Sequence, residues 1–295
     1  MDRRAFLVAG SIGLASTSAW AAMRKIEVPR PSGVDRLHDA IARIEARSGG
    51  RLGVAFHDTG TGHRFAYRGD ERFAMCSTFK LLLAGAVLAR VQQRAERLDR
   101  PMPIRASDVI GHAPFTAKRV GGTATVAELC RAMTVESDNG GANLMLAAIG
   151  GPAALTRFLR QTGDPTTRLD RTEPSLNEAT PGDPRDTTTP LAMLGSAERL
   201  WLGPVLAPAY RAQLTAWAIE CRTGLERLRA GLPKGWRAGD KTGTGDRGTF
   251  NDVAIFWPPR RKPVLVTSYL SESKLDTDAG NAVHAQVARA LVGMI

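Results

Sequence analysis

The chain has 295 residues, 43% of them hydrophobic, and is long enough to bury a large core. Its 40 basic and 29 acidic residues give a net charge of +11, but they form no basic run, which excludes the usual pattern of a nucleic-acid-binding protein. Five scattered histidines and three cysteines match no metal-ligand spacing, so we expect neither a metal nor another cofactor. The charge instead favours small anionic substrates.

Residues 1–21, MDRRAFLVAGSIGLASTSAWA, have the pattern of an export signal: a charged start, a short apolar stretch and a cleavage pattern at Ala19–Ala21. Arg3 and Arg4, followed by Phe6, resemble a twin-arginine signal, with an ordinary Sec signal as the alternative. The apolar stretch is too short and glycine-rich for a retained membrane anchor. We therefore expect a periplasmic product, free of the membrane, with a net charge of about +10.

The predicted elements begin with an amphipathic helix over 34–47, whose apolar stripe is Val34, Leu37, Ile41 and Ile44. Residues 51–69 alternate in two short runs around a Gly- and Asp-rich turn, which predicts a β-hairpin. The pattern in the middle of the chain, about 70–218, predicts helices joined by short loops. Within it, residues 168–186 hold three prolines and no sustained period, and a loop of this length is usually functional.

Strand patterns return at 235–242, 250–257 and 263–270, and a final helix carries Val283, Val287, Leu291 and Met294 at helical spacing. This order predicts an α+β fold, with a five-stranded antiparallel sheet flanked by helices and an all-helical second domain. The α/β domain would comprise residues 30–68 and 220–295. The helical domain would comprise residues 69–219 and would carry the 168–186 loop.

An unusual lysine lies in the stretch FAMCSTFKLLLAGAVLAR, residues 73–90. The helix predicted here is apolar nearly all round, so Lys80 is expected to be buried, and a buried lysine needs a partner or a chemical role. Ser77 stands three residues earlier, on the same helical face. At a helix N-terminus a serine can act as a nucleophile when a neighbouring base accepts its proton.

Three further motifs follow in order: SDN at 137–139, EPSLN at 173–177 and KTG at 241–243. Each is weak alone. Together with the Ser77–Lys80 pair, their order and spacing resemble the class A serine β-lactamases, from about Ser32 to the C-terminus. The resemblance implies hydrolysis of penicillins and cephalosporins and thereby β-lactam resistance. The implied partners are the β-lactam and one catalytic water, and we expect a monomer.

The resemblance also implies catalytic roles. Ser77 would open the four-membered ring and form an acyl-enzyme, with the backbone amides of Ser77 and Thr244 as the oxyanion hole. Lys80 would share protons with Ser77 and Glu173, and Ser137 would pass a proton to the ring nitrogen. Glu173 would activate the deacylating water. Whether Glu173 or Lys80 activates Ser77 for acylation stays open at this point.

The remaining site residues follow from the same resemblance. The substrate-binding residues would be Asn139, Asn177, Lys241, Thr242, Gly243 and Thr244, with His112 at the cleft mouth. Asn177 would also hold the water, Asn143 would support Glu173, and Arg171 with Asp186 would clasp the 168–186 loop. The Glu173–Pro174 bond is expected to be cis.

The chain departs from better-known members of the family at two places. Many carry a carboxylate-binding arginine on the strand after KTG, where Phe250 stands here. Arg227 resembles the position of a compensating arginine, and we expect it at the cleft surface with few core contacts. Cys130 and Cys76 resemble cysteines that form disulfides in some members of the family, but the partner cysteines are missing here. Ala84 stands at the position that would pair with Cys130, and Gly245 at the position that would pair with Cys76. We expect free thiols.

Two alternatives share part of this motif set. A penicillin-binding DD-peptidase acylates with the same drugs but lacks a deacylating glutamate in an equivalent loop, so Glu173 argues against it. A β-lactam sensor domain acylates and stops there, and such domains are usually tethered to a membrane. Turnover of a chromogenic cephalosporin separates the hydrolase from both, because they would give a single stoichiometric burst.

Overall fold

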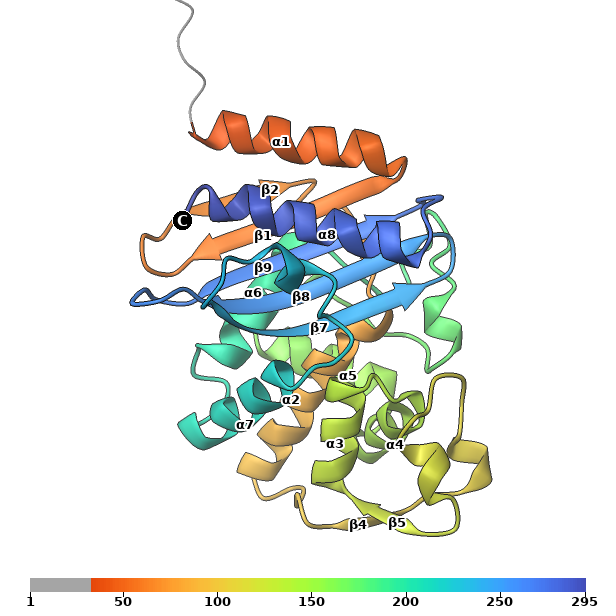
Figure 1. The fold of residues 1–295 in the computed structure, drawn as a ribbon. Helices are drawn as coiled ribbons and strands as arrows, with labels where there is room; N and C mark the ends of the chain where they lie inside the picture. The colour runs from red at the N-terminus through yellow and green to blue at the C-terminus, as the bar shows by residue number, and fades with distance from the viewer. Residues whose placement is uncertain (1–32) are drawn as a thin grey trace, which may run out of the picture. The chain divides into compact units, whose positions relative to one another are not determined.

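The computed structural model describes residues 33–295 (Figure 1). Its α-helices are α1 (Gly33–Ser48), α2 (Phe79–Gln92), α3 (Val126–Val135), α4 (Asn139–Ile149), α5 (Pro152–Gln161), α6 (Pro190–Trp201), α7 (Pro208–Ile219) and α8 (Thr277–Val292). Its strands are β1 (Arg51–Asp58), β2 (Arg64–Tyr67), β3 (Phe73–Ala74), β4 (Pro101–Pro103), β5 (Thr123–Thr125), β6 (Thr187–Thr188), β7 (Arg237–Gly245), β8 (Thr249–Trp257) and β9 (Val264–Ser271). Its 3₁₀ helices are η1 (Cys76–Thr78), η2 (Ala106–Asp108), η3 (Thr116–Arg119), η4 (Ser175–Asn177) and η5 (Leu228–Gly231).

The main sheet has five strands in the order β2-β1-β9-β8-β7, and every neighbouring pair is antiparallel. Strand β9, near the C-terminus, pairs along the whole of β1, so the sheet is built from both ends of the described chain. The predicted α+β fold and its five-stranded antiparallel sheet are confirmed. Strands β8 and β9 are buried almost throughout, because helices cover both faces of the sheet.

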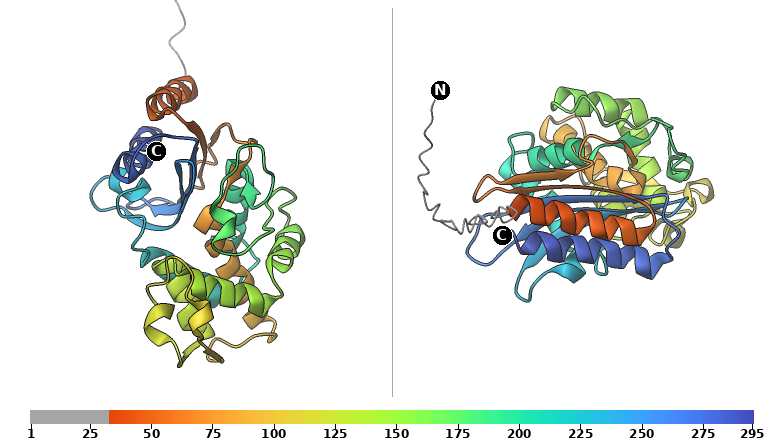
Figure 2. Two further views of the ribbon diagram at one scale, coloured as in Figure 1. Left: turned by 90° about the vertical axis from the view of Figure 1, so that its right-hand side faces the viewer. Right: turned by 90° about the horizontal axis from the view of Figure 1, so that it is seen from above.

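Helices α1 and α8 pack side by side on one face of the sheet, while α6 and α7 contact the other face (Figure 2). Leu37, Ile41 and Ile44 of α1 are buried, as the stripe predicts. Val34 is 54% exposed, so its inclusion in that stripe is wrong. It stands in the first turn of α1, where the stripe begins.

Helix α2 lies at the centre of the helical layer and contacts α3, α4, α5, α6 and α7. Its residues from Phe79 to Ala89 are all buried, which explains why its sequence is apolar nearly all round. The preceding η1 contacts β7 and β8. The fold therefore places the N-terminal end of α2, with Ser77, against the edge strand of the sheet.

The structure differs from the predicted elements in three details. The 3₁₀ turn η1 contains Ser77, so α2 itself begins only at Phe79. Strand β7 continues beyond residue 242 to Gly245, because Gly243–Gly245 still pair with β8. The helix-rich middle also contains the four short strands β3 to β6.

The described residues fall within one compact unit, so the division into two domains stays a prediction. The predicted signal peptide, residues 1–21, lies outside the described residues. Within residues 33–295 no single helix is long and apolar enough to cross a membrane; only α4 and α5 together pass by length and composition, with a bend of 68° between them.

Candidate active site

A cleft of about 370 Å³ opens beside η1, η4 and the end of β7. It is lined by Ser77, His112, Ser137, Asn139, Asn177, Thr223, Arg227, Thr242 and Thr244. All of these except Thr223 are predicted site residues. The predicted residues Lys80, Glu173 and Lys241 are buried close to this cleft and hydrogen bond to residues that line it.

Ser77 lies at the cleft floor in η1, directly after Cys76, whose φ of 44° is in the left-handed region. Ser77 is 9% accessible, and its hydroxyl donates to Glu173 Oε1 at 3.3 Å. The residue that is predicted to be the nucleophile and the carboxylate that is predicted to be the base are therefore in hydrogen-bond contact, although 96 residues separate them in the chain.

Lys80 is completely buried, and its ammonium contacts Glu173, Asn139 and Ser137. Its Nζ lies 2.9 Å from Glu173 Oε1 and donates to Asn139 Oδ1 at 2.6 Å and to the Ser137 carbonyl at 2.8 Å. Burial lowers the pKa of Lys80, and the Glu173 carboxylate opposes this shift. The expected buried and paired lysine is present.

Ser137 lies between two lysines. Its Oγ is 3.1 Å from Lys241 Nζ and 3.4 Å from Lys80 Nζ, and its φ of 60° is left-handed. Both ammonium groups donate to the hydroxyl oxygen, so the single Ser137 proton is free to point elsewhere. Burial, and then the charge of Lys80, lower the pKa of Lys241 to about 8; the nearby Cys221 and Asp240 act in the opposite direction.

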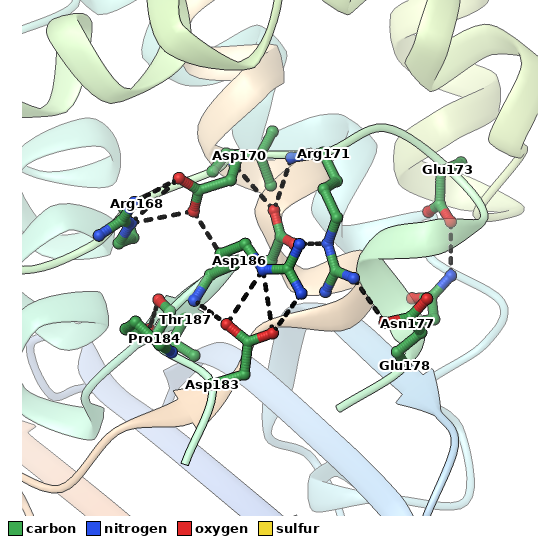
Figure 3. Close-up of polar contacts among 12 residues, drawn as sticks. Arg168, Asp170, Arg171, Glu173, Asn177, Glu178, Asp183, Pro184, Asp186 and Thr187 are labelled. Carbon is green, nitrogen blue, oxygen red and sulfur yellow. Dashed lines mark hydrogen bonds and ion pairs between the residues drawn. The ribbon is translucent and has the colours of Figure 1, made fainter. Parts of the chain in front are cut away.

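Glu173 is held from two directions, by Asn143 and by Asn177, and Figure 3 shows the contact with Asn177. Asn143 in α4 accepts from its backbone amide at 3.0 Å and donates to its carbonyl at 2.9 Å. Asn177 donates to Glu173 Oε2 at 2.6 Å. The Glu173–Pro174 bond is cis, as predicted. The predicted support of Glu173 by Asn143 is therefore present at the backbone, and Asn177 orients the carboxylate itself.

The 168–186 loop is closed by Asp186, which is fully buried (Figure 3). Asp186 accepts from Arg171 Nε at 2.6 Å and from the amides of Arg171 and Asp170 at 2.9 and 2.7 Å. Asp170 in turn accepts from the Asp186 amide and pairs with Arg168. The predicted pair of Arg171 and Asp186 is present, but Asp170 and Arg168 also belong to the clasp. Neither of these two residues belongs to a motif, so the sequence could not identify them.

Arg227 is 4% accessible, which corrects the expectation of a cleft-surface residue with few core contacts. Its Nη1 donates to the backbone carbonyls of Gly243 and Asn251, at 2.7 and 2.6 Å. Nη2 donates to Thr244 Oγ1 at 2.6 Å and Nε to Asn281 Oδ1 at 2.7 Å. The guanidinium thus ties β7 to β8 and α8, while still lining the cleft.

The KTG strand approaches η1 closely. A Cβ added to Gly243 would lie 2.6 Å from the Met75 carbonyl, so no side chain fits there. Gly243 is absent from the cleft lining, and its part is to permit this approach. His112 does line the cleft: its Nε2 is 2.8 Å from the Glu136 carbonyl, and its own carbonyl accepts from the Asn139 amide at 2.9 Å.

Cys76, Cys130 and Cys221 are buried free thiols, so the predicted absence of disulfides is confirmed within residues 33–295. A Cβ added to Gly245 would lie 2.5 Å from Cys76 Sγ. The two positions are therefore adjacent, and a bridge is missing only because Gly245 has no side chain. Burial raises the pKa of Cys221 to about 11, so its thiol stays protonated at neutral pH.

Comparison with known proteins places this geometry in a family. Residues 36–295 match the model of the β-lactamase enzyme family. The β-lactamase CTX-M-8 of Citrobacter amalonaticus is 47% identical over 84% of this chain and 86% of its own. The β-lactamase OXY-2 of Klebsiella oxytoca is 44% identical over 94% of this chain and 91% of its own.

Two solved structures extend the match. An ancestral class A β-lactamase is 60% identical, with a TM-score of 0.87 over 88% of this chain and 100% of its own. A β-lactamase from Xanthomonas campestris is 51% identical, with a TM-score of 0.87 over 88% of this chain and 97% of its own. The chain belongs to the β-lactamase enzyme family, among its class A members.

Proposed function

We propose that the protein hydrolyses penicillins and cephalosporins through an acyl-enzyme on Ser77, which a Glu173-activated water deacylates. The observation that carries this proposal is the position of Glu173 Oε1, 3.3 Å from Ser77 Oγ and 2.9 Å from Lys80 Nζ. One carboxylate oxygen is within reach of the nucleophile's proton and is stabilised by a buried ammonium. That arrangement suits acyl transfer.

In acylation, the Ser77 oxygen attacks the lactam carbonyl while its proton passes to Glu173, the acceptor that it already contacts. Negative charge on the carbonyl oxygen is stabilised by the backbone amides of Ser77 and Thr244. When the C–N bond breaks, Ser137 donates its proton to the ring nitrogen. The two lysines that donate to the Ser137 oxygen stabilise the resulting negative charge. The proton on Glu173 then returns to Ser137 through Lys80, whose Nζ contacts both groups, so that Glu173 is a carboxylate again before deacylation.

In deacylation, a water gives its proton to Glu173 and attacks the acyl ester. As the ester bond breaks, Glu173 passes this proton to the Ser77 oxygen, which it contacts in the free enzyme. Asn177 supports this step, because its amide holds the other carboxylate oxygen at 2.6 Å and fixes the direction of the first. Asn143 keeps the Glu173 backbone in place. A peptidase or sensor without such a base would stop at the acyl-enzyme.

The substrate carboxylate would bind where Lys241, Thr242, Thr244 and Arg227 converge. Within the described residues, Arg227 hydrogen bonds only to neutral acceptors, so its charge remains for a ligand. Burial and the nearby Asp240 raise the pKa of Asp252, a carboxyl group near this guanidinium, well above its usual value. Asn139 would bind the amide of the substrate side chain.

The proposal is tested by the hydrolysis of a chromogenic cephalosporin by the purified mature chain. We expect many turnovers per molecule at a constant rate. A single burst equal to the amount of protein would instead support the DD-peptidase or the β-lactam sensor.

At alkaline pH, kcat/KM should fall as the ammonium of Lys241 loses its proton. Its pKa near 8 means that the ammonium deprotonates as the pH rises through 8, and a neutral amine holds a carboxylate poorly. We expect kcat/KM, which reports the free enzyme, to fall about tenfold per pH unit above this value. In Lys241→Arg the cation persists, so this alkaline limb should disappear. A limb at the same pH in both proteins would assign the titration to another group.

Arg227→Ala should weaken both binding and folding. Loss of a charge-assisted contact to the substrate carboxylate should lower kcat/KM by about 10- to 150-fold, mainly through KM. The Gly243 and Asn251 carbonyls would lose a buried donor, so the free energy of unfolding should fall by about 2–4 kcal/mol. Substrate kinetics at 25 °C and a denaturant titration measure the two effects. An unchanged denaturation midpoint would contradict the structural role, and kinetics within twofold of the parent would contradict the binding role.

We also propose export to the periplasm, by the twin-arginine route or by Sec, followed by cleavage after Ala21. The expected product is a monomer that confers β-lactam resistance. N-terminal sequencing of the protein from a periplasmic extract tests the cleavage site, and replacement of Arg3 and Arg4 by lysine tests the route, because only twin-arginine export depends on that pair.

A further inference from the structure

Thr223 lines the cleft but belongs to none of the motifs. It lies after α7, and its Oγ1 is 2.6 Å from Thr242 Oγ1 in the KTG strand and 3.3 Å from Cys221 Sγ. Thr242 is 4% accessible and Cys221 is 2% accessible, whereas Thr223 is exposed. A chain of three side chains therefore runs from a buried thiol to the hydroxyl expected to meet the substrate carboxylate.

Either hydroxyl can be the donor in the contact between Thr223 and Thr242, and the number of protons present favours one direction. Each threonine hydroxyl has one proton and two lone pairs, and sulfur is a weak acceptor. The Cys221 thiol is protonated, and the Asp240 carboxylate also lies within its reach. Among these three side chains, the only strong acceptor for the Thr223 proton is therefore the Thr242 oxygen.

We propose that Thr223 is a positioning residue for the substrate carboxylate: its hydroxyl donates to Thr242 Oγ1 and so directs the Thr242 proton into the cleft. Arg227 acts on Thr244 in the same way, by donating to its oxygen at 2.6 Å. Both threonines then present their protons to an anion beside Lys241. This inference rests on the carboxylate-binding part of the proposed function.

The test compares Thr223→Val, which keeps the shape, with Thr223→Ser, which keeps the hydroxyl. For benzylpenicillin, Thr223→Val should raise KM about threefold to tenfold, the effect of one neutral hydrogen bond, with kcat within twofold. Thr223→Ser should restore the parent KM. On the penicillin methyl ester, which has no carboxylate charge, Thr223→Val and the parent should agree within twofold.

Thr242→Val separates this inference from the proposed function. It should raise KM for benzylpenicillin by itself, and adding Thr223→Val to it should change KM no further, since Thr223 acts through Thr242. If Thr242→Val leaves KM unchanged, the proposed carboxylate site is wrong. If Thr242→Val raises KM but Thr223→Val does not, or if Thr223→Val raises KM equally for the ester, only the role of Thr223 is overturned.

Discussion

The Ser77→Ala protein should hydrolyse penicillins about 10⁴-fold more slowly than the parent, or slower still, because the substitution removes the only atom that can form the acyl-enzyme. The fold should survive, since the Ser77 side chain contributes one hydrogen bond, to Glu173. Steady-state kinetics measure the first effect and circular dichroism the second. Intact-mass spectrometry after incubation with a penicillin should find no covalent adduct.

Ser175→Ala is the matched control for Ser77→Ala. Ser175 is an exposed serine in η4 of the 168–186 loop, close to the site but outside the cleft lining. The Ser175→Ala protein should keep turnover within about twofold, because the Ser175 side chain is exposed and lies outside the cleft. Surface substitutions of this kind usually change the free energy of unfolding very little. A mass adduct on the Ser77→Ala protein would show that another residue is the nucleophile.

Glu173→Ala should separate the two half-reactions. Deacylation should slow by about 10²- to 10⁴-fold, because its general base is lost. Acylation should continue, because Lys80 then loses the carboxylate that opposes the effect of burial on its pKa. A neutral Lys80 amine, one helical turn beyond Ser77, can accept the serine proton in place of Glu173. The acyl-enzyme should therefore accumulate, with a burst of one product per protein in a stopped-flow assay.

Asp183→Ala is the control for this effect. Asp183 is a carboxylate of the same loop that pairs locally with Arg185, outside the cleft. Its removal should leave steady-state turnover within about threefold of the parent. Undiminished hydrolysis by Glu173→Ala would exclude Glu173 from the mechanism, and loss of the burst as well would show that acylation also depends on this carboxylate.

Local spacing was sufficient to predict a large part of the site. Ser77 and Lys80 lie one turn apart, so any helix through them brings both to one face. The apolar residues around Lys80 predicted its burial. The alternation in 51–69 and the strand patterns at 235–242, 250–257 and 263–270 predicted the strands, and the order of the elements along the chain predicted the antiparallel sheet.

Contacts between distant segments were not predictable in this way. Arg227 is buried because Asn281 of α8 and the carbonyls of two strands surround it, and no local pattern in the sequence shows that enclosure. Thr223 is a lone threonine without a motif, and only the packing of its segment against β7 brings it to Thr242. The family resemblance predicted the roles of the site residues. The contacts between distant segments show that Arg227 is buried, which the resemblance did not predict.

The central claim, a Ser77 acyl-enzyme released by Glu173, is tested most directly by mapping the trapped adduct. Glu173→Ala would be incubated with benzylpenicillin, quenched in acid and digested with trypsin, which releases residues 73–80 as one peptide, FAMCSTFK. Tandem mass spectrometry should place one penicilloyl group on Ser77 of this peptide, and the parent should lose the group within the time of its turnover. A penicilloyl group on any other residue, or an unmodified peptide while the penicillin is consumed, would contradict the account.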